Sequence, residues 1–260
     1  MSTVYIVKST PVRDRVSEAE WNMRVELAAC YRLVARYGMT DLIYNHITAR
    51  VPDSDNHILI NAYGYLYTEI TASNLYKIDL DGNVLLKPDT HYGINHAGYV
   101  IHSAVHGARH DVECVVHTHS RAGMAVSAMQ CGLLPLTQTA MRFAGVVSYH
   151  DYEGPAIDLD ERQRLVADLG SNDVMILRNH GLLACGRSVA ETFNMLYWLE
   201  MACKAQVDAM SSGAKLTMPN QGVAEKTAHL YAPGTRRVFG AMEWEAMLRQ
   251  LDRDDPSYRT

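Results

Sequence analysis

The sequence predicts an α/β protein with one large domain and a short C-terminal tail. Three observations indicate this fold class. Apolar runs with the length of buried strands alternate with segments of helical periodicity. The 260 residues are enough for one substantial hydrophobic core. No internal repeat or change of composition divides the chain. We therefore expect a domain over residues 1–213 and a tail over residues 214–260 that packs on this domain or on a neighbouring subunit.

The first third of the chain is expected to form a helix followed by short strands. Ser17 and Glu20 make a capping-box pattern at the start of the helix, and Gly38 is a typical stop. Apolar residues recur between them at helical spacing: Met23, Leu27, Cys30, Val34 and Tyr37. The strand-like runs that follow are residues 43–51, 57–69 and 76–86. The Asp81-Gly82 dipeptide inside the last run predicts a hairpin.

The remainder of the chain alternates between the two kinds of segment. The expected helices cover residues 94–109, 120–129, 158–170, 188–213 and 241–253. The expected strands cover residues 111–119, 145–152, 173–181 and 182–186. Ser120 is a candidate N-cap for the second of these helices, and Asp158 with Glu161 for the third. Three large apolar residues indicate that the tail packs on another element: Trp244, Met247 and Leu251.

Composition and charge exclude several classes of function. The formal net charge is -5 and basic residues form no stripe, so a nucleic-acid partner is not expected. No apolar stretch reaches the roughly 18–20 residues that cross a bilayer, and the start of the chain lacks the apolar core of a secretory signal. Five cysteines lie far apart without a C-x-x-C motif, which argues against a disulfide framework. These features predict a cytoplasmic protein without a membrane or nucleic-acid partner.

Two histidines end an apolar run in the stretch "CVVHTHSRAG". His117 and His119 are one residue apart, and side chains alternate between the faces of a strand, so both rings project the same way. The pair alone fits two hypotheses equally. The rings are either hydrogen-bonded core histidines or ligands of one metal ion.

A third imidazole is available in "RNHGLL". His180 follows a buried strand in an Asn-His-Gly turn, which is either a plain tight turn or a functional one. Three neutral nitrogen ligands suit zinc first, and manganese, cobalt or iron(II) less selectively. Three protein ligands also leave a coordination position open for water or substrate, which is typical of a catalytic site.

These motifs resemble the class II aldolase/adducin family. The resemblance rests on "DVECVVHTHS" and "RNHGLL", and on "YGMTDLIYNHITARV", "INAYGYLYTEITASNLYKIDLDGNVL", "IHSAVHGARHDV" and "CGLLPLTQTAM". It covers residues 18–213. It implies a three-layer α/β/α sandwich around a largely antiparallel central sheet, and a homotetramer with sites near subunit interfaces. It also implies that His117, His119 and His180 are the metal ligands.

The chain departs from the sugar-phosphate aldolases of this family at the acid/base position. Those enzymes place a glutamate 19 positions before the first histidine of the H-x-H pair, and this sequence has Gly98 there. A glycine cannot transfer a proton, and loss of a general acid/base costs about two to four orders of magnitude in rate. Two candidates for a replacement proton shuttle are His102 and His96. The alternative is that His102 and His106 line a polar groove or hydrogen-bond neighbouring loops.

The residues that match the phosphate pocket of the aldolases are also altered. Asn45 and Gly64 match family positions and are predicted to bind substrate. Tyr63 replaces a threonine, and His96 and Ala97 replace two serines. Three tyrosines alternate along a predicted strand and share one face, as a core stripe or as a site wall: Tyr63, Tyr65 and Tyr67. We expect Tyr63 at the site, because the glycine beside it permits close approach of a ligand.

The sequence therefore predicts a metal-dependent lyase acting on a small molecule. Decarboxylation of a carboxylated, for example aromatic, substrate needs no base to break the bond, so it tolerates the loss of the glutamate better than phosphosugar aldol cleavage does. Two alternatives stay open. The first is a non-haem iron(II) oxygenase/decarboxylase, such as those described from aminocoumarin pathways within this family. The second is a non-catalytic interaction module, because "IHSAVHGARHDV", "CGLLPLTQ" and Gly98 look closer to the adducin branch.

Overall fold

An eight-stranded sheet lies at the centre of the computed structural model, which describes residues 10–154, 159–220, 222–232, 235 and 238–260. The strand order is β4-β3-β2-β1-β5-β8-β7-β6. All neighbouring strands are antiparallel except β6 and β7, so the predicted antiparallel sheet is confirmed. The strands are β1 (Ile47–Arg50), β2 (His57–Asn61), β3 (Leu75–Asp79), β4 (Val84–Leu86), β5 (Cys114–Thr118), β6 (Val147–His150), β7 (Val174–Leu177) and β8 (Gly181–Gly186).

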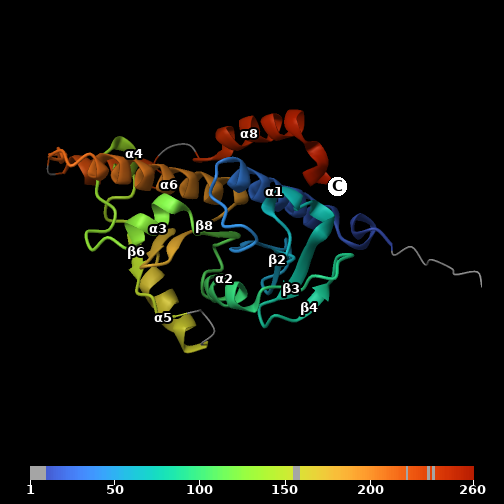
Figure 1. Ribbon diagram of the computed structural model, residues 1–260. Helices are drawn as coiled ribbons and strands as arrows, with labels where there is room; N and C mark the ends of the chain where they lie inside the picture. The colour runs from blue at the N-terminus through green and yellow to red at the C-terminus, as the bar shows by residue number, and fades with distance from the viewer. Residues whose placement is uncertain (1–9, 155–158, 221, 233–234, 236–237) are drawn as a thin grey trace, which may run out of the picture.

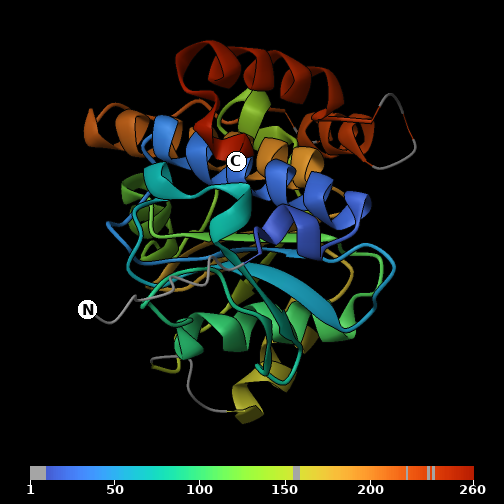
Figure 2. The same ribbon diagram turned by 90° about the vertical axis from the view of Figure 1, so that its right-hand side faces the viewer.

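Helices cover both faces of the sheet, and Figure 2 shows the three layers edge-on. One layer holds α1 (Glu18–Arg36), α3 (Arg121–Ser127), α4 (Gln138–Met141), α6 (Val189–Ser211), α7 (Val223–Tyr231) and α8 (Ala241–Asp254). The other layer holds α2 (His96–Ala108) and α5 (Leu159–Leu169). Short 3-10 turns complete the described chain: η1 (Val12–Arg15), η2 (Tyr67–Glu69), η3 (Ala72–Asn74) and η4 (Pro256–Arg259). The predicted α/β/α sandwich is confirmed. Short α4 and α7 were not expected.

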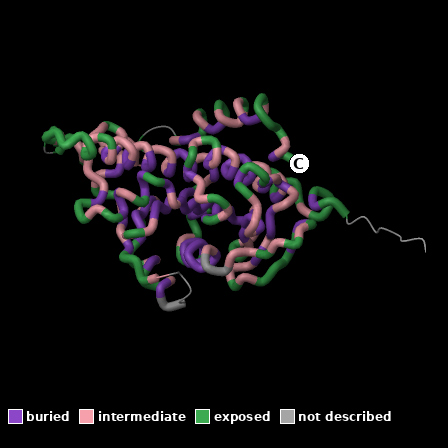
Figure 3. Tube along the Cα trace, viewed as in Figure 1, coloured by how far each residue is buried: buried purple, intermediate pink, exposed green. Residues whose placement is uncertain are grey.

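The core follows the alternation of side chains along the central strands. On β5, Val116 belongs to the cluster under α1 and α6, whereas Val115 belongs to the cluster under α2 and α5. Figure 3 shows the buried chain concentrated between the two helical layers. Because faces alternate, the residue after Val116 projects toward α2. This residue is His117, so the strand pattern sends its imidazole to the α2 side of the sheet.

The tail packs on the domain as its apolar residues indicate. Trp244 and Leu251 of α8 are buried in the same core as α1 and α6, and Met247 packs against it. The division of the chain at residue 213 stays a prediction. Among the helices in the described part of the chain, none combines the length and apolarity needed to cross a bilayer.

Two predicted local features differ in the structure. Residues 63–67 do not form a strand: Tyr63 and Tyr65 follow the end of β2 in irregular chain, and Tyr67 starts η2. The tyrosines contact three different rings, Tyr44, Tyr92 and Tyr31, so the predicted shared face is wrong. Hydrogen bonding explains the difference, because Tyr63 N–H donates to the Gly93 carbonyl outside the sheet at 2.8 Å.

The N-terminus of α3 is also capped differently from the prediction. Ser120 occupies the N-cap position, but its hydroxyl makes no cap bond and donates instead to the carboxylate of Glu200 on α6. Glu200 itself accepts from the Gly123 backbone N–H, so a carboxylate from another helix serves the free amides of α3. The predicted cap at Asp158 lies outside the described residues.

Candidate metal centre

The structure brings the three predicted ligands together at one end of the sheet. His117 is the last residue but one of β5, His119 directly follows that strand, and His180 lies in the turn between β7 and β8. Their rings are 4.7–4.8 Å apart, centroid to centroid. One ligand atom from each ring lies within 4.8 Å of the others, and the two Nε2 atoms of the H-x-H pair are 3.0 Å apart. This spacing fits one ion held by three imidazoles.

Strand pairing explains why residues so far apart in sequence meet here. β5 and β8 pair antiparallel, with His117 opposite Leu183 and Thr118 opposite Leu182. The turn that precedes β8 is sharp, because Asn179 has a φ of 55° and lets the chain reverse within three residues. Gly181 then lies so close to β5 that a Cβ there would be 2.3 Å from the Thr118 carbonyl oxygen. His180 therefore lies next to the H-x-H pair.

Hydrogen bonds at the outer nitrogens direct the inner nitrogens at one another. His117 Nδ1 is 2.9 Å from the Leu182 carbonyl, which can only accept, so Nδ1 carries the proton. His119 Nδ1 is 3.1 Å from Asp41 Oδ2, so it too donates. In their neutral form, the rings of His117 and His119 therefore each keep a lone pair on Nε2. Two lone pairs 3.0 Å apart repel unless a cation lies between them, so this donor set fits a metal.

Burial keeps two of these imidazoles, His117 and His180, neutral. Burial is the main cause that lowers the pKa of His117 well below its usual value, and the neighbouring histidines lower it further. Burial also lowers the pKa of His180 to about 4, with His119 as the next contribution. Neutral imidazole is the form that binds a metal ion.

Loss of the Asp41 carboxylate is expected to weaken metal binding. We expect Asp41→Ala to reduce affinity about 10–100-fold, because His119 loses the acceptor that fixes its tautomer and ring orientation. Competition titration with a chelating dye measures the change. Asp55→Ala, at an exposed loop position, is the matched control. Equal affinity in both variants would show that Asp41 does not hold the ligand.

Backbone strain is concentrated beside the ligands. Four non-glycine residues in the described chain have a positive φ, and three of them adjoin this centre: Leu42, Asn45 and Asn179. Such conformations cost about 1–3 kcal/mol each and cluster at functional sites. Asn45 Oδ1 accepts a hydrogen bond from the His119 backbone N–H at 3.2 Å. Its Nδ2 is buried and has no acceptor among the described residues, so it is available to a substrate oxygen. The predicted role of Asn45 in substrate binding stays a prediction.

A residue that the sequence did not single out, His46, takes up the space at Gly98. A Cβ at Gly98 would lie 1.7 Å from His46 Cδ2 and 2.0 Å from its Nε2, so the imidazole ring fills the place of a side chain on α2. Burial, followed by the charge of His119, lowers the pKa of His46 to about 4. Only the pairing of β1 with β5 brings His46 here, and no spacing rule in the sequence reveals that pairing.

Of the two predicted proton shuttles, the structure describes the side chain of His102. His102 is fully buried, and its Nδ1 lies 2.8 Å from Thr48 Oγ1; His106 Nε2 lies 2.9 Å from the same hydroxyl. Burial lowers the pKa of His102 well below its usual value and that of His106 to about 3. This arrangement favours the alternative in which both rings hydrogen-bond inside the protein. The side chain of His96 lies outside the described residues, so its role stays a prediction.

The glycine predicted to admit a ligand faces an aromatic ring. A Cβ at Gly64 would be 2.4 Å from the ring of Tyr92, so Tyr92 fills the space that the glycine leaves. Tyr63 is half-buried, and its ring centroid lies 6.1 Å from that of Tyr44. Burial and the Tyr44 hydroxyl raise the pKa of Tyr63. The catalytic role of Tyr63 and the binding of substrate by Gly64 stay predictions.

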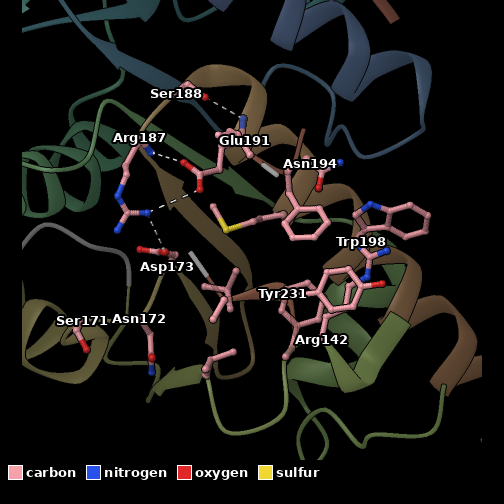
Figure 4. Close-up of a pocket in the computed structure, with 17 residues that line it drawn as sticks. Arg142, Ser171, Asn172, Asp173, Arg187, Ser188, Glu191, Asn194, Trp198 and Tyr231 are labelled. Atoms are coloured by element: carbon pink, nitrogen blue, oxygen red, sulfur yellow. Dashed lines mark hydrogen bonds and ion pairs between the residues drawn. The ribbon is translucent and has the colours of Figure 1, made fainter. Parts of the chain in front are cut away.

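A pocket of about 580 Å³ lies away from the histidines, between α6, α7 and the start of β7 (Figure 4). Figure 4 shows Arg187 with Asp173 at one side and Trp198 with Tyr231 at the other. Asp173 directly precedes β7, whereas His180 follows its far end. The pocket and the metal centre therefore lie at opposite ends of this strand, and none of the three imidazoles lines the pocket.

The structure is similar to solved structures over nearly its whole length. An aldolase II superfamily protein from Pseudomonas syringae is 52% identical, with a TM-score of 0.90, over 96% of this chain and 100% of that one. An L-fuculose 1-phosphate aldolase from Glaciozyma antarctica PI12 is 25% identical, with a TM-score of 0.82, over 93% of each chain.

The sequence also matches eukaryotic adducins. Alpha-adducin from Rattus norvegicus is 40% identical over 272 residues, which is 96% of this chain and 36% of the adducin. The model of the class II aldolase and adducin N-terminal domain matches residues 25–207, which contain all three predicted ligands. With more than half of its length matched, the chain belongs to the class II aldolase and adducin family.

Proposed function

We propose that this protein is a metal-dependent lyase that cleaves a carbon–carbon bond of a small carboxylated substrate, as in decarboxylation. The observation that carries the proposal is the 3.0 Å distance between the Nε2 atoms of His117 and His119. The Nδ1 atom of each ring donates a hydrogen bond, so Nε2 keeps its lone pair. Zinc suits three neutral imidazoles first, and manganese, cobalt and iron(II) accept the same ligands. When bound, such an ion supplies Lewis-acid stabilisation of negative charge.

The chain's own groups support a substrate that carries oxygen atoms. Asn45 Nδ2 is a buried donor without an acceptor among the described residues, and it adjoins the backbone of His119. Position 98 offers no carboxylate, and the ring of His46 fills its space. Cleavage of a phosphosugar by the acid/base route of the aldolases is therefore not expected here.

A second candidate function is a non-catalytic interaction module. The 40% identity to alpha-adducin over 96% of the chain favours it. The iron oxygenase alternative has less support, because the ligand group found among the described residues consists of three imidazoles and no carboxylate.

Metal analysis and a substrate screen test the proposal. Protein purified with and without air is assayed for divalent metals, and the loaded protein is screened with aliphatic and aromatic 2-oxo acids, aldehydes and L-fuculose 1-phosphate. We expect about one ion per chain, turnover of a carboxylated compound that chelation abolishes, and little cleavage of the phosphosugar. Strong phosphosugar cleavage would overturn the decarboxylation proposal. A fully loaded protein without turnover would favour the interaction module.

We further propose a homotetramer in the cytoplasm. The long apolar helix α6 gives this proposal no support, because it packs on β5, β8, α1, α3, α4 and α8 of its own chain. Support comes from the family and from two exposed apolar side chains, Leu42 and Tyr44, next in sequence to Asp41 and Asn45, which contact His119. The unpaired cysteines fit a reducing compartment. Light scattering should give about four times the 29.1 kDa chain mass, and a monomer at micromolar concentration would contradict the tetramer.

A further inference from the structure

A cavity away from the metal centre has a polar end and an aromatic end. It is the pocket of about 580 Å³ beside α6 (Figure 4), and its volume is typical of a small-molecule site. One face of α6 forms a wall of the cavity, because residues at helical spacing line it: Glu191, Asn194, Met195 and Trp198. Glu191 and Trp198 are seven residues apart, so about 10 Å of helix axis separates the two ends. A ligand that contacts both ends has this length.

A buried amide without a partner borders the middle of this cavity. Asn194 is 6% exposed, and no hydrogen bond joins its side chain to any residue in the part of the chain that the structure describes. Figure 4 shows it between Glu191 and Trp198. Most buried side-chain amides have a hydrogen-bond partner, and an amide offers both donors and an acceptor. Asn194 can therefore form hydrogen bonds of both kinds with a ligand in the cavity.

The polar end has carboxylate oxygens that can accept further hydrogen bonds. Arg187 Nη1 lies 3.7 Å from Asp173 Oδ2 and 3.7 Å from Glu191 Oε1, and this distance is too long for a hydrogen bond. The other oxygen of each carboxylate has a partner. Asp173 Oδ1 accepts from Arg109 at 2.9 Å, and Glu191 Oε2 accepts from a backbone N–H at 3.0 Å. A carboxylate only accepts, so the ligand groups at this end are donors.

The aromatic end is built around a guanidinium. The guanidinium carbon of Arg142 lies 4.4 Å from the ring centroid of Trp198 and 4.1 Å from that of Tyr231. This stacking fixes both rings at the cavity, which Phe143 also lines. Aromatic side chains pack well on a planar ring, by stacking or edge to face. The ligand part at this end is therefore a planar ring system.

The charges that line the cavity balance. Among the lining residues that the structure describes, two arginines and two carboxylates are charged: Arg142, Arg187, Asp173 and Glu191. Behind them, Arg109 and Asp111 add one charge of each sign. An ammonium or a carboxylate on the ligand would leave one charge unpaired, which is costly in a partly buried site. An uncharged ligand is therefore favoured.

We propose that this cavity is a second binding site, for an uncharged heteroaromatic ligand with hydroxyl groups, of the nucleoside class. The sugar hydroxyls donate to Asp173 and Glu191. The edge of the base pairs with the Asn194 amide, because both carry a donor beside an acceptor. The face of the base packs on the rings at Trp198. The inference does not rest on the lyase function, because none of the three predicted metal ligands lines the cavity.

Calorimetric titration of the metal-loaded protein with three probes tests the ligand class. The probes are adenosine, the cation tryptamine and the anion indole-3-propionate. We expect adenosine to bind at a single saturable site. Each charged probe should bind about 10-fold more weakly or worse, because it makes the ring contacts but leaves a charge unpaired. His117→Ala should bind adenosine as the unmodified protein does, because His180 and Asp173 lie at opposite ends of β7.

Two substitutions on α6 test the contacts themselves. Asn194→Leu keeps the side-chain volume but removes the amide, and we expect adenosine affinity to fall about 5–10-fold because the base edge loses its partner. Glu191→Gln removes a charge, while its amide oxygen can still accept from the Arg187 backbone N–H. We expect a similar decrease for adenosine and tighter binding of indole-3-propionate. Asp208→Asn, exposed on the same helix, is the control and should bind adenosine normally.

Four results would contradict the inference, and each leaves the lyase function standing. Unchanged adenosine affinity in Asn194→Leu and Glu191→Gln would overturn the site. Loss of adenosine binding in His117→Ala would place the ligand at the metal centre instead. Tighter binding of either charged probe than of adenosine would overturn the ligand class, and absence of adenosine binding by the unmodified protein would overturn the whole inference. Circular dichroism checks that Asn194→Leu is folded; if it is not, Glu191→Gln alone decides.

Discussion

Replacement of His117 by alanine is expected to remove the bound metal while the fold persists. Loss of a group that merely orients a ligand costs about 10–100-fold in metal affinity, so loss of the ligand itself should cost more. The remaining pair, His119 and His180, supplies two nitrogens, one fewer than the three-imidazole group. Elemental analysis after gel filtration should therefore find less than about one tenth of an ion per chain.

The fold should tolerate this substitution. The His117 side chain donates to the Leu182 carbonyl, and leaving such a carbonyl unsatisfied costs about 1–3 kcal/mol. Circular dichroism and the elution volume should match those of the unmodified protein. His57→Ala is the control. His57 starts β2, at the opposite end of that strand from Asn61, the residue that contacts His46. Full metal occupancy in His117→Ala would make the three imidazoles ordinary core histidines.

The cluster of three imidazoles could be predicted because its signals are local. One intervening residue in a strand places His117 and His119 on one side, and the Asn-His-Gly turn places His180 at a strand end. His46 gave no such signal. The position of its ring against α2 depends on the register of β1 against β5 and on the missing Cβ of Gly98. Both are properties of the assembled sheet and of α2.

The elements of the fold could be predicted where hydrophobic periodicity was unbroken. The range, N-cap and Gly38 stop of α1 agree with the expectation, and Ser17 accepts from the Glu20 N–H at 3.1 Å. The tyrosine run failed because alternation in sequence continues after the chain has left the sheet at Asn61. Ser120 occupies the predicted N-cap position but makes no side-chain cap bond, because Glu200 of α6 accepts the Gly123 N–H in its place. Tertiary contacts decided both cases.

Charged residues buried inside an apolar stripe were the least predictable part of α1. Glu20 and Arg24 lie on the same helical face as Leu27 and Tyr31, although charged side chains are rarely fully buried. Arg24 donates to Glu20 at 3.0 Å and to the carbonyls of Ala72 and Leu75. The same face carries the Tyr31 hydroxyl that contacts Asn61, the partner of His46. The stripe therefore combines hydrophobic packing with polar contacts that hold η3 and the start of β1.

Arg24→Ala is expected to cause the largest loss of stability of any substitution discussed here, about 3–5 kcal/mol. Glu20 would stay buried with Lys77 as its remaining cationic partner, and the Ala72 and Leu75 carbonyls would each lose a donor. Urea unfolding measures the change. Arg36→Ala on the same helix removes an exposed pair with Asp254 and should cost less than about 1 kcal/mol. Similar losses in both variants would mean that burial adds nothing to the Arg24 contacts. Folded Arg24→Ala protein should still bind metal, because its lost contacts lie at η3 and β3 rather than at the histidines.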